Sequence, residues 1–522
     1  MAITMSRNMK RISIIFATLL ALSWSQGSIL AQDPSNEGPS GGSTQAGQAG
    51  GGQVGGGPTN PSIAKTSRSA RRSSRPSSVA AARRSTSSTK RPQPEESLSD
   101  KVERALEEGN AARDRRRYSE AESLYRQALG LDAKEARAYI GLGNIYFDQD
   151  RYDQAIEYYR VAIKLQPGNA EAYSNLGYGY IRLRKDIEAE PFIRQALALD
   201  PQSATAITRQ GHLYRSQRKF NEALEEYKKA INLKPEYAEP YNGLGLTYVD
   251  LKNYSQAIDQ FQKAISLRPD WSFPYNNLGA LYLGQKRYSE AIEQFKKTIG
   301  LQPNDAMVYY NVGNVYFDQK KYAEAIEQYN IAVSLKPDYA GAYNRLGFAL
   351  YYERKYDEAI DQFKKAIGAA PDNGVSCNGL GLSYSAQKKY DAAIEQYKKA
   401  ATVAPNWSYP YYNMGEAYHL LNNYTESIVA YKKAISISPN WPYPCNSLGI
   451  VYYDQRKYTD AMEQFNKAIS LQSNFAAAYY NLGLVNLQLK DKNAALEQCR
   501  KLQTLDPERA QRLLQLINKS SK

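Results

Sequence analysis

Two histidines and three cysteines are the residues of this chain best suited to metal binding or nucleophilic catalysis. His212 and His419 lie far apart, without the spacing of a metal site or a catalytic pair. Cys377, Cys445 and Cys499 are odd in number and widely separated, so they predict buried, inert thiols rather than a disulfide framework. No glycine-rich phosphate loop or Ser-His-Asp arrangement appears. We therefore expect a non-enzymatic protein with no metal and no cofactor.

Asparagine offers a different chemistry, because its amide both donates and accepts hydrogen bonds and can bind the backbone of an extended peptide. Asparagines recur along the chain at Asn175, Asn242, Asn276, Asn277, Asn311, Asn314, Asn344, Asn378, Asn413, Asn446 and Asn481. These amides can act together only if the fold brings them to one surface. The elements that carry them therefore decide what they can do.

A repeated segment supplies these elements. The sequence "RYSEAIEQFKK" at 287–297 returns as "KYAEAIEQYNI" at 321–331, and related copies follow at 355–365 and 389–399. One glycine marks each copy, at intervals of 34 residues: Gly109, Gly143, Gly177, Gly211, Gly245, Gly279, Gly313, Gly347, Gly381, Gly415, Gly449 and Gly483. We call these the ladder glycines. Twelve repeats of 34 residues account for residues 102–509.

Each repeat reads as two helices. In the sixth repeat, Ser272 to Asp305, the residues Tyr275, Leu278 and Tyr282 share one face of a first helix. Ala291, Phe295 and Ile299 share one face of a second helix, "GQKR" at 284–287 separates the two, and Pro303 ends the second. One such hairpin cannot bury its own apolar stripe, so the repeats must stack on one another.

The period and the order Tyr–Leu-Gly–Tyr–Ala–Phe–Pro resemble the tetratricopeptide repeat. This resemblance covers about four-fifths of the chain and implies an all-α, right-handed superhelical solenoid of helix-turn-helix repeats at 101–509. It also implies that peptides or partner proteins bind the inner groove, which the first helices line. We place a C-terminal capping helix at 510–522.

The groove residues that we predict to contact a partner come from the first helices of several repeats. They are Asn175, Arg209, Asn276, Tyr310, Asn311, Asn314, Phe317, Asn344, Arg345 and Asn413. The alternative is that these polar groups only solvate or cap their helices. Some members of the family clamp a C-terminal carboxylate with Lys, Asn and Arg side chains. Asn144, Asn175 and Arg209 match part of that clamp, but Ile140 and Thr205 replace both of its lysines, which argues against it.

The third repeat departs from the pattern inside the array. Asp186 replaces the usual tyrosine, and Pro191 falls within the expected second helix. Since proline removes a backbone donor and clashes with the preceding turn, we expect a kink or a late helix start there.

The first hundred residues differ from the repeats in composition. Residues 1–31 combine Arg7, Lys10 and Arg11 with the apolar run "ISIIFATLLAL", which predicts a secretory signal peptide or, alternatively, an uncleaved anchor. Residues 32–100 are Gly-rich and then Ser/Arg-rich, which predicts a disordered linker. Its tract 65–94 holds nine basic residues and no acidic one. It is either a solvated spacer or a weak contact to an anionic surface, without specificity for nucleic acid.

These observations predict an exported, periplasmic or secreted scaffold that binds one or more proteins or extended peptides along a long repeat surface. The alternative is an accessory arm that presents substrates to a separately encoded enzyme such as a glycosyltransferase. The sequence leaves the identity of the partner and the oligomeric state open.

Overall fold

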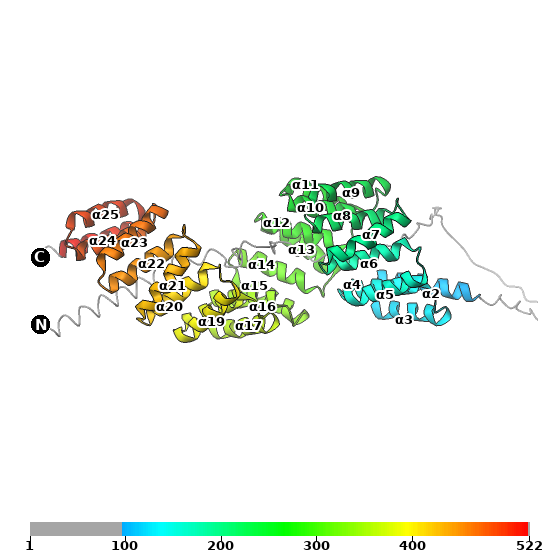
Figure 1. Cartoon of the computed structure of the whole chain (residues 1–522), viewed down its shortest axis with the longest axis horizontal. Helices are drawn as coiled ribbons and strands as arrows, with labels where there is room; N and C mark the ends of the chain where they lie inside the picture. Colours follow the sequence, from blue (N-terminus) through cyan, green and yellow to red (C-terminus); the bar gives the residue numbers. More distant parts are fainter. Residues whose placement is uncertain (1–96, 520–522) are drawn as a thin grey trace, which may run out of the picture. The chain divides into compact units, whose positions relative to one another are not determined.

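The computed structural model describes residues 97–519, and every regular element in that range is an α-helix (Figure 1). The predicted signal peptide and nearly all of the predicted linker lie outside the described residues. The helices fall into an N-terminal half, residues 97–301, and a C-terminal half, residues 302–519. None of the helices described is both long and apolar enough to cross a bilayer.

Six helix pairs make up the N-terminal half. They are α2 (Leu98–Asp114), α3 (Tyr118–Leu131), α4 (Ala136–Asp148), α5 (Tyr152–Leu165), α6 (Ala170–Arg182), α7 (Asp186–Leu199), α8 (Ala204–Ser216), α9 (Phe220–Leu233), α10 (Ala238–Asp250), α11 (Tyr254–Leu267), α12 (Ser272–Gly284) and α13 (Tyr288–Leu301).

Six further pairs and one final helix make up the C-terminal half. They are α14 (Ala306–Asp318), α15 (Tyr322–Leu335), α16 (Ala340–Tyr352), α17 (Tyr356–Ala369), α18 (Gly374–Ala386), α19 (Tyr390–Val403), α20 (Ser408–Leu420), α21 (Tyr424–Ile437), α22 (Pro442–Asp454), α23 (Tyr458–Leu471), α24 (Ala476–Gln488), α25 (Lys492–Leu505) and α26 (Pro507–Lys519). The predicted all-α solenoid of twelve helix pairs is confirmed.

The ladder glycines allow the two helices of each pair to pack closely. A Cβ atom added at Gly279 would lie 2.7 Å from the ring of Phe295 on α13, closer than real carbon contacts allow. The same clash recurs along the ladder, with Tyr, Phe or Ile on the second helix. At Gly483, Leu513 of α26 fills this place instead, because the last repeat has the smaller Cys499 at the ring position.

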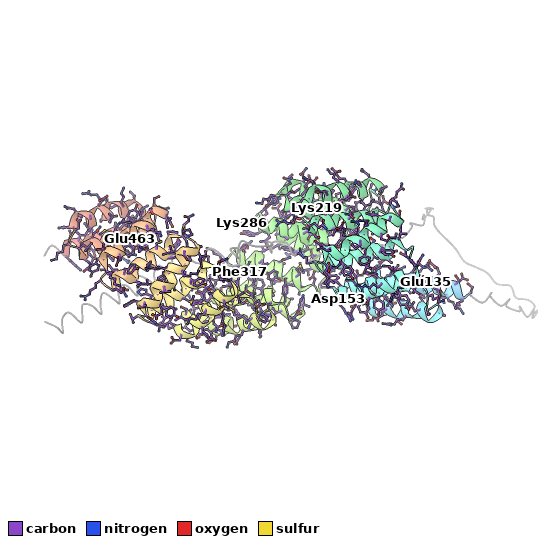
Figure 2. The ribbon with its side chains drawn as sticks, in the orientation of Figure 1. Glu135, Asp153, Lys219, Lys286, Phe317 and Glu463 are labelled. Carbon is purple, nitrogen blue, oxygen red and sulfur yellow. The ribbon has the colours of Figure 1, made fainter. Side chains whose placement is uncertain are left out.

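The turn between the two helices is the same in every repeat. Twelve non-glycine residues at intervals of 34, from Arg116 to Lys490, adopt a left-handed backbone with φ between 58° and 64°. After α12, the amides of Lys286 and Arg287 donate to the carbonyls of Leu283 and Tyr282, which closes the helix end (Figure 2 labels Lys286). The predicted break at 284–287 is therefore a tight C-terminal cap.

The stacking of the pairs defines two faces within each half. First helices of neighbouring repeats touch one another, as α8 touches α10 and α16 touches α18, whereas the described second helices make no comparable contact. The first helices are therefore crowded on the inner side of each stack, and the second helices are spread on the outer side. We call the surface of the first helices the inner face.

Three expectations need correction. The α7 helix is full-length and continuous through Pro191, so a late start is wrong. Pro191 is its sixth residue and removes only a bond to the first turn, at Ile187, which is 87% exposed. At the ends of the array, α2 begins at Leu98 with a capping box at Ser97, inside the predicted linker. The final helix begins at Pro507 rather than at 510.

Candidate functional site

All ten residues that we predicted as partner ligands lie on first helices, from α6 to α20. The structure does not make them equivalent. Some are buried between repeats and already bonded to neighbouring side chains, and others remain partly open on the inner face. The difference between the two groups decides where a partner can bind.

Arg209 belongs to the first group. Its side chain on α8 is only 1% exposed and forms an ion pair with Glu239 of α10. The guanidinium also lies 4.1 Å from the centroid of the Tyr178 ring on α6. Its charge is thus committed to neighbours in adjacent repeats. Arg209 matches one position of the carboxylate clamp, but the carboxylate that it binds is that of Glu239 in the same chain.

His212 and Tyr237 complete this buried cluster. His212 Nε2 lies 3.1 Å from Oε1 of Glu239, and its Nδ1 lies 2.8 Å from the hydroxyl of Tyr227. The Tyr237 hydroxyl donates a hydrogen bond to Glu239. A neutral ring protonated at Nε2 satisfies both of its neighbours. We call Arg209, His212, Tyr237 and Glu239 the charged cluster.

Burial and charge act in opposite directions on the pKa values of this cluster. Burial tends to raise the pKa of Glu239, but the charge of Arg209 and the hydrogen bonds from His212 and Tyr237 outweigh it and hold the pKa at about 2. For His212, burial dominates and lowers the pKa below its ordinary value of 6.5. The cluster is an internal ion pair with a neutral histidine.

The asparagines are largely paired with one another across repeat boundaries. Asn277 donates to Asn242, Asn413 donates to Asn378 and Asn481 donates to Asn446, each over 2.9–3.0 Å and 35 residues of sequence. Asn175 similarly donates to Asn144 over 3.2 Å. These amides hold neighbouring first helices together. Part of the hydrogen-bonding capacity of each amide is therefore already used within the chain.

Two further predicted asparagines are buried. Asn276 on α12 is 6% exposed, and Asn344 on α16 accepts a hydrogen bond of 2.9 Å from the hydroxyl of Ser376. Together with Arg209, they depart from our expectation of exposed groove ligands. The physical reason is that buried polar side chains, from which water is excluded, bond to polar groups of neighbouring repeats, as Asn344 and Arg209 do.

In several repeats, the residue that follows the ladder glycine bonds to the tyrosine on the second helix of the same repeat. On α14, Asn314 accepts a hydrogen bond of 2.8 Å from the buried hydroxyl of Tyr329. Five tyrosines on second helices bond in this way to Asn, His or Glu, in the pairs Tyr125–Asn110, Tyr159–Asn144, Tyr227–His212, Tyr329–Asn314 and Tyr431–Glu416. Where the ring is Phe, the residue after the glycine is apolar: Leu246, Ala280, Phe348 and Ile450. This pairing within the chain was a readable signal that the periodicity analysis missed.

The remaining predicted residues gather on α14 and α16 in the C-terminal half. Tyr310, Asn311 and Phe317 of α14 and Arg345 of α16 are all partly exposed (Figure 2 labels Phe317). The guanidinium of Arg345 lies 5.3 Å from the centroid of the Phe317 ring. Tyr352, also on α16, packs edge-on against Phe317 with ring centroids 5.8 Å apart. We call Tyr310, Phe317, Arg345 and Tyr352 the aromatic patch.

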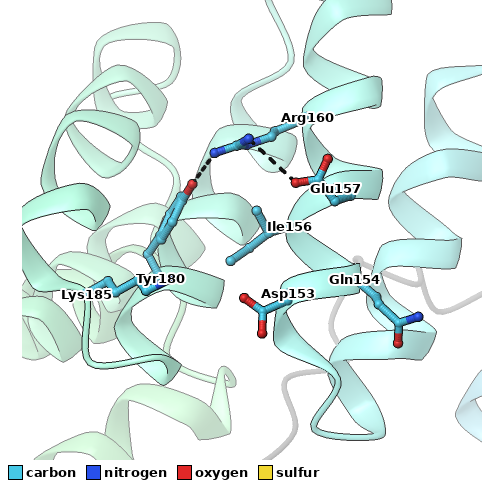
Figure 3. Close-up of a pocket in the computed structure, with 7 residues that line it drawn as sticks. All are labelled: Asp153, Gln154, Ile156, Glu157, Arg160, Tyr180 and Lys185. Atoms are coloured by element: carbon cyan, nitrogen blue, oxygen red, sulfur yellow. Dashed lines mark hydrogen bonds and ion pairs between the residues drawn. The ribbon is translucent and has the colours of Figure 1, made fainter.

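A small hollow in the N-terminal half lies between α5 and α6 (Figure 3). Its volume is about 350 Å³, and Asp153, Glu157, Arg160 and Lys185 contribute both signs of charge. Arg160 bonds to the Tyr180 hydroxyl and pairs with Glu157 over 3.6 Å. The charges that line this hollow are balanced and partly paired, so the hollow favours neither anionic nor cationic ligands.

The residues best suited to chemistry do not come together in the described part of the chain. Cys377, Cys445 and Cys499 are buried free thiols whose pKa values are raised by burial, as expected for inert packing residues. Within residues 97–519, no group of three or more His, Cys, Asp or Glu side chains is arranged to hold a metal ion.

Comparison with known proteins gives the family. Models of the tetratricopeptide repeat match residues 106–170, 170–203, 238–270, 338–406 and 476–509, and a model described as a TPR repeat matches 211–252, 282–319, 313–353, 415–456 and 451–490. The chain is also similar to one in the crystal structure of the APC/C hetero-tetramer Cut9-Hcn1, with a TM-score of 0.41 and 14% identity over 80% of this chain and 97% of that one. No curated protein matches. The repeats, the helix pairs and the matched models agree, and the chain belongs to the tetratricopeptide repeat family.

Proposed function

We propose that this chain is a non-enzymatic scaffold that binds a segment of a partner protein on the inner face of its C-terminal half. The observation that carries the proposal is the aromatic patch on α14 and α16. Phe317 and Arg345 are partly exposed there and stacked on each other. Aromatic and arginine side chains dominate the binding energy of protein interfaces, because they bury large areas and keep a polar end.

The inner face of the N-terminal half supports this choice by contrast. Arg209 has its carboxylate partner within the chain, so a ligand would have to displace Glu239 to use its charge. Breaking such a buried pair is costly. The aromatic patch differs in burial, because the rings of Tyr310, Phe317 and Tyr352 are partly exposed and offer apolar surface to a partner.

The proposed scaffold acts outside the cytoplasm, in the periplasm or as a secreted protein. The support is the basic and apolar pattern of residues 1–31. The basic tract 65–94 would then link the repeats to the surface of the cell envelope or act only as a spacer. A fusion of residues 1–40 to a reporter that is active only after export tests the location. A reporter that stays inactive and cytoplasmic overturns it.

The binding site is tested with the full-length chain carrying a photo-crosslinking amino acid at position 317. A matched control carries the same amino acid at Lys364, which is exposed on the second helix α17. We expect cross-links to a discrete partner from position 317 and not from position 364. Equal cross-linking from both positions, or none from position 317, overturns the aromatic patch as the site.

A pair of charge variants makes the same comparison without a probe. Arg345→Glu reverses a charge on the inner face, and Lys364→Glu reverses one on the outer face. The cross-linked partner should be lost from the first variant and kept by the second. Capture of a glycosyltransferase as that partner would favour the accessory-arm alternative over a general scaffold.

A further inference from the structure

A second hollow lies in the C-terminal half, between α19, α20 and α21. Its volume is about 760 Å³, about twice that of the hollow between α5 and α6. Tyr411, Met414 and Tyr418 of α20 line it together with small residues of the two second helices. It is mainly apolar and open to solvent. We call it the α19–α21 hollow.

Two alanines create this space. Ala401 on α19 stands where ten of the other eleven repeats have Leu, Ile or Val, as Ile367 and Ile435 do. Ala430 on α21 stands where every other repeat has a larger side chain, which is Gln in seven of them. Both alanines are buried and line the hollow. The two shortened side chains come from neighbouring repeats and meet at one junction.

A third departure makes the edge of the hollow apolar. Val429 stands where nine of the other eleven repeats carry Asp or Glu, and its side chain is 65% exposed. It is the most exposed large apolar residue that the C-terminal half shows among residues 302–519. A solvated carboxylate is thus replaced by an isopropyl group beside an open cavity. Exposed apolar surface next to a cavity is typical of a binding site.

The charges around the hollow indicate what can occupy it. Lys398 of α19 and Lys433 of α21 both line it and are exposed, and Lys433 Nζ lies 5.9 Å from the centroid of the Tyr411 ring. Glu426 is the one carboxylate among its lining residues. The basic tract of the same chain, 65–94, is of the wrong sign for two lysines. The ligand that complements this hollow is therefore an apolar group flanked by negative charges.

We propose that the α19–α21 hollow is a second docking site, distinct from the aromatic patch. It takes one aromatic or large aliphatic side chain from a partner protein, in a segment where acidic residues flank that side chain. The apolar group fills the space left by Ala401 and Ala430 and contacts Val429. The acidic neighbours face Lys398 and Lys433. This proposal goes beyond inner-face binding and stands without it.

The variant Ala401→Ile/Ala430→Gln tests the site by filling it. These are the residues that the chain itself uses at the equivalent junctions, so the fold should tolerate them. A random peptide library displayed on phage is selected on the full-length protein and counter-selected on the filled variant. Circular dichroism and thermal unfolding of both proteins establish that each is folded.

We expect enriched peptides with an aromatic or large aliphatic residue beside Asp or Glu. Each should bind the wild type at least about tenfold more tightly than the filled variant, because burial of such a side chain is worth roughly 1.5–3 kcal/mol. Peptides that bind both proteins equally overturn the proposal, as do enriched peptides without acidic residues or the absence of any enrichment. Self-association of the wild type that the filled variant lacks would assign the hollow to a second copy instead, and would also overturn it.

A second variant keeps the hollow and reverses the charge around it. Lys398→Glu/Lys433→Glu changes two exposed side chains, so folding should be unaffected. Peptide affinity should fall several-fold at low salt, and this loss should shrink as salt screens the charges. The inner-face variant Arg345→Glu should bind the same peptides as the wild type. Loss of peptide binding in Arg345→Glu but not in the filled variant would place the peptides on the aromatic patch.

Discussion

The charged cluster in the N-terminal half and the α19–α21 hollow in the C-terminal half both depart from the 34-residue pattern that all the repeats share. The cluster adds polar atoms at the inner face, where Glu239 pairs with both Arg209 and His212. The hollow removes atoms, because Ala401 and Ala430 replace larger residues, and no described side chain fills the space. The charged residues that the cluster adds have partners within the chain, whereas the space that the two alanines leave is open to solvent.

This difference teaches how to interpret an irregular position in a repeat protein. An unusual charged residue is costly to bury unless a partner is supplied, so the fold must supply one. A missing apolar side chain at the surface carries no such requirement. Irregular charges are thus more informative about stability, and irregular small residues are more informative about binding.

Of the variants that test this comparison, Glu239→Ala should cause the largest loss of stability. It leaves Arg209 buried without its carboxylate, which should lower the free energy of unfolding by about 3–5 kcal/mol. Urea unfolding followed by circular dichroism, with hydrogen exchange in α8 and α10, measures the loss. The exposed Glu236→Ala is the matched control and should change little. If both variants unfold alike, the cluster does not stabilise the N-terminal half.

Asn314→Leu should have an intermediate effect. It removes the acceptor of the buried Tyr329 hydroxyl, which should cost about 1–3 kcal/mol. Adding Tyr329→Phe should recover most of that loss, because the pair then resembles the repeats that combine Phe with an apolar residue. The free energies of unfolding of both single variants and the double variant provide the test. No recovery in the double variant would mean that Asn314 acts elsewhere, for example on a partner.

The pH dependence of stability should report on His212. Because burial lowers its folded-state pKa below 6.5, the unfolded chain binds the proton more readily, and stability contributed by the neutral ring is lost as the pH falls below about 6.5. The carboxyl of Glu239, with a folded pKa of about 2, keeps its contribution until the pH falls below its ordinary value of 4.5. Between pH 4.5 and pH 6.5, the thermal midpoint of His212→Gln should vary less with pH than that of the wild type. Equal slopes would contradict a buried neutral histidine.

Ala401→Ile/Ala430→Gln should have the smallest effect on stability. The added side chains enter existing space, so we expect a gain of about 1 kcal/mol at most in the free energy of unfolding. Thermal unfolding measures it. A loss of several kcal/mol would show that the junction is already fully packed, and it would contradict the hollow itself.

Much of the fold was readable from the sequence. The ladder glycines and the aromatic, alanine and proline positions fixed twelve helix pairs, because each pair depends on residues close together in the chain. The expected late helix start at Pro191 was wrong, because a proline in the second turn removes only one backbone hydrogen bond, at the exposed first turn. The site was less predictable. The sequence located the inner face, but it did not show which of its polar groups were already engaged.

The sequence by itself determined the period, the helix pairs and the face on which Arg209, Asn277 and Phe317 lie. Only the tertiary structure decided that Arg209 is bonded within the chain, that Asn277 is paired with Asn242, and that Phe317 stays partly exposed. The physical reason is distance along the chain. Helix formation and hairpin packing are settled within 34 residues, whereas a side chain at a repeat boundary is satisfied by a partner about 30–35 residues away, and only packing brings the two together.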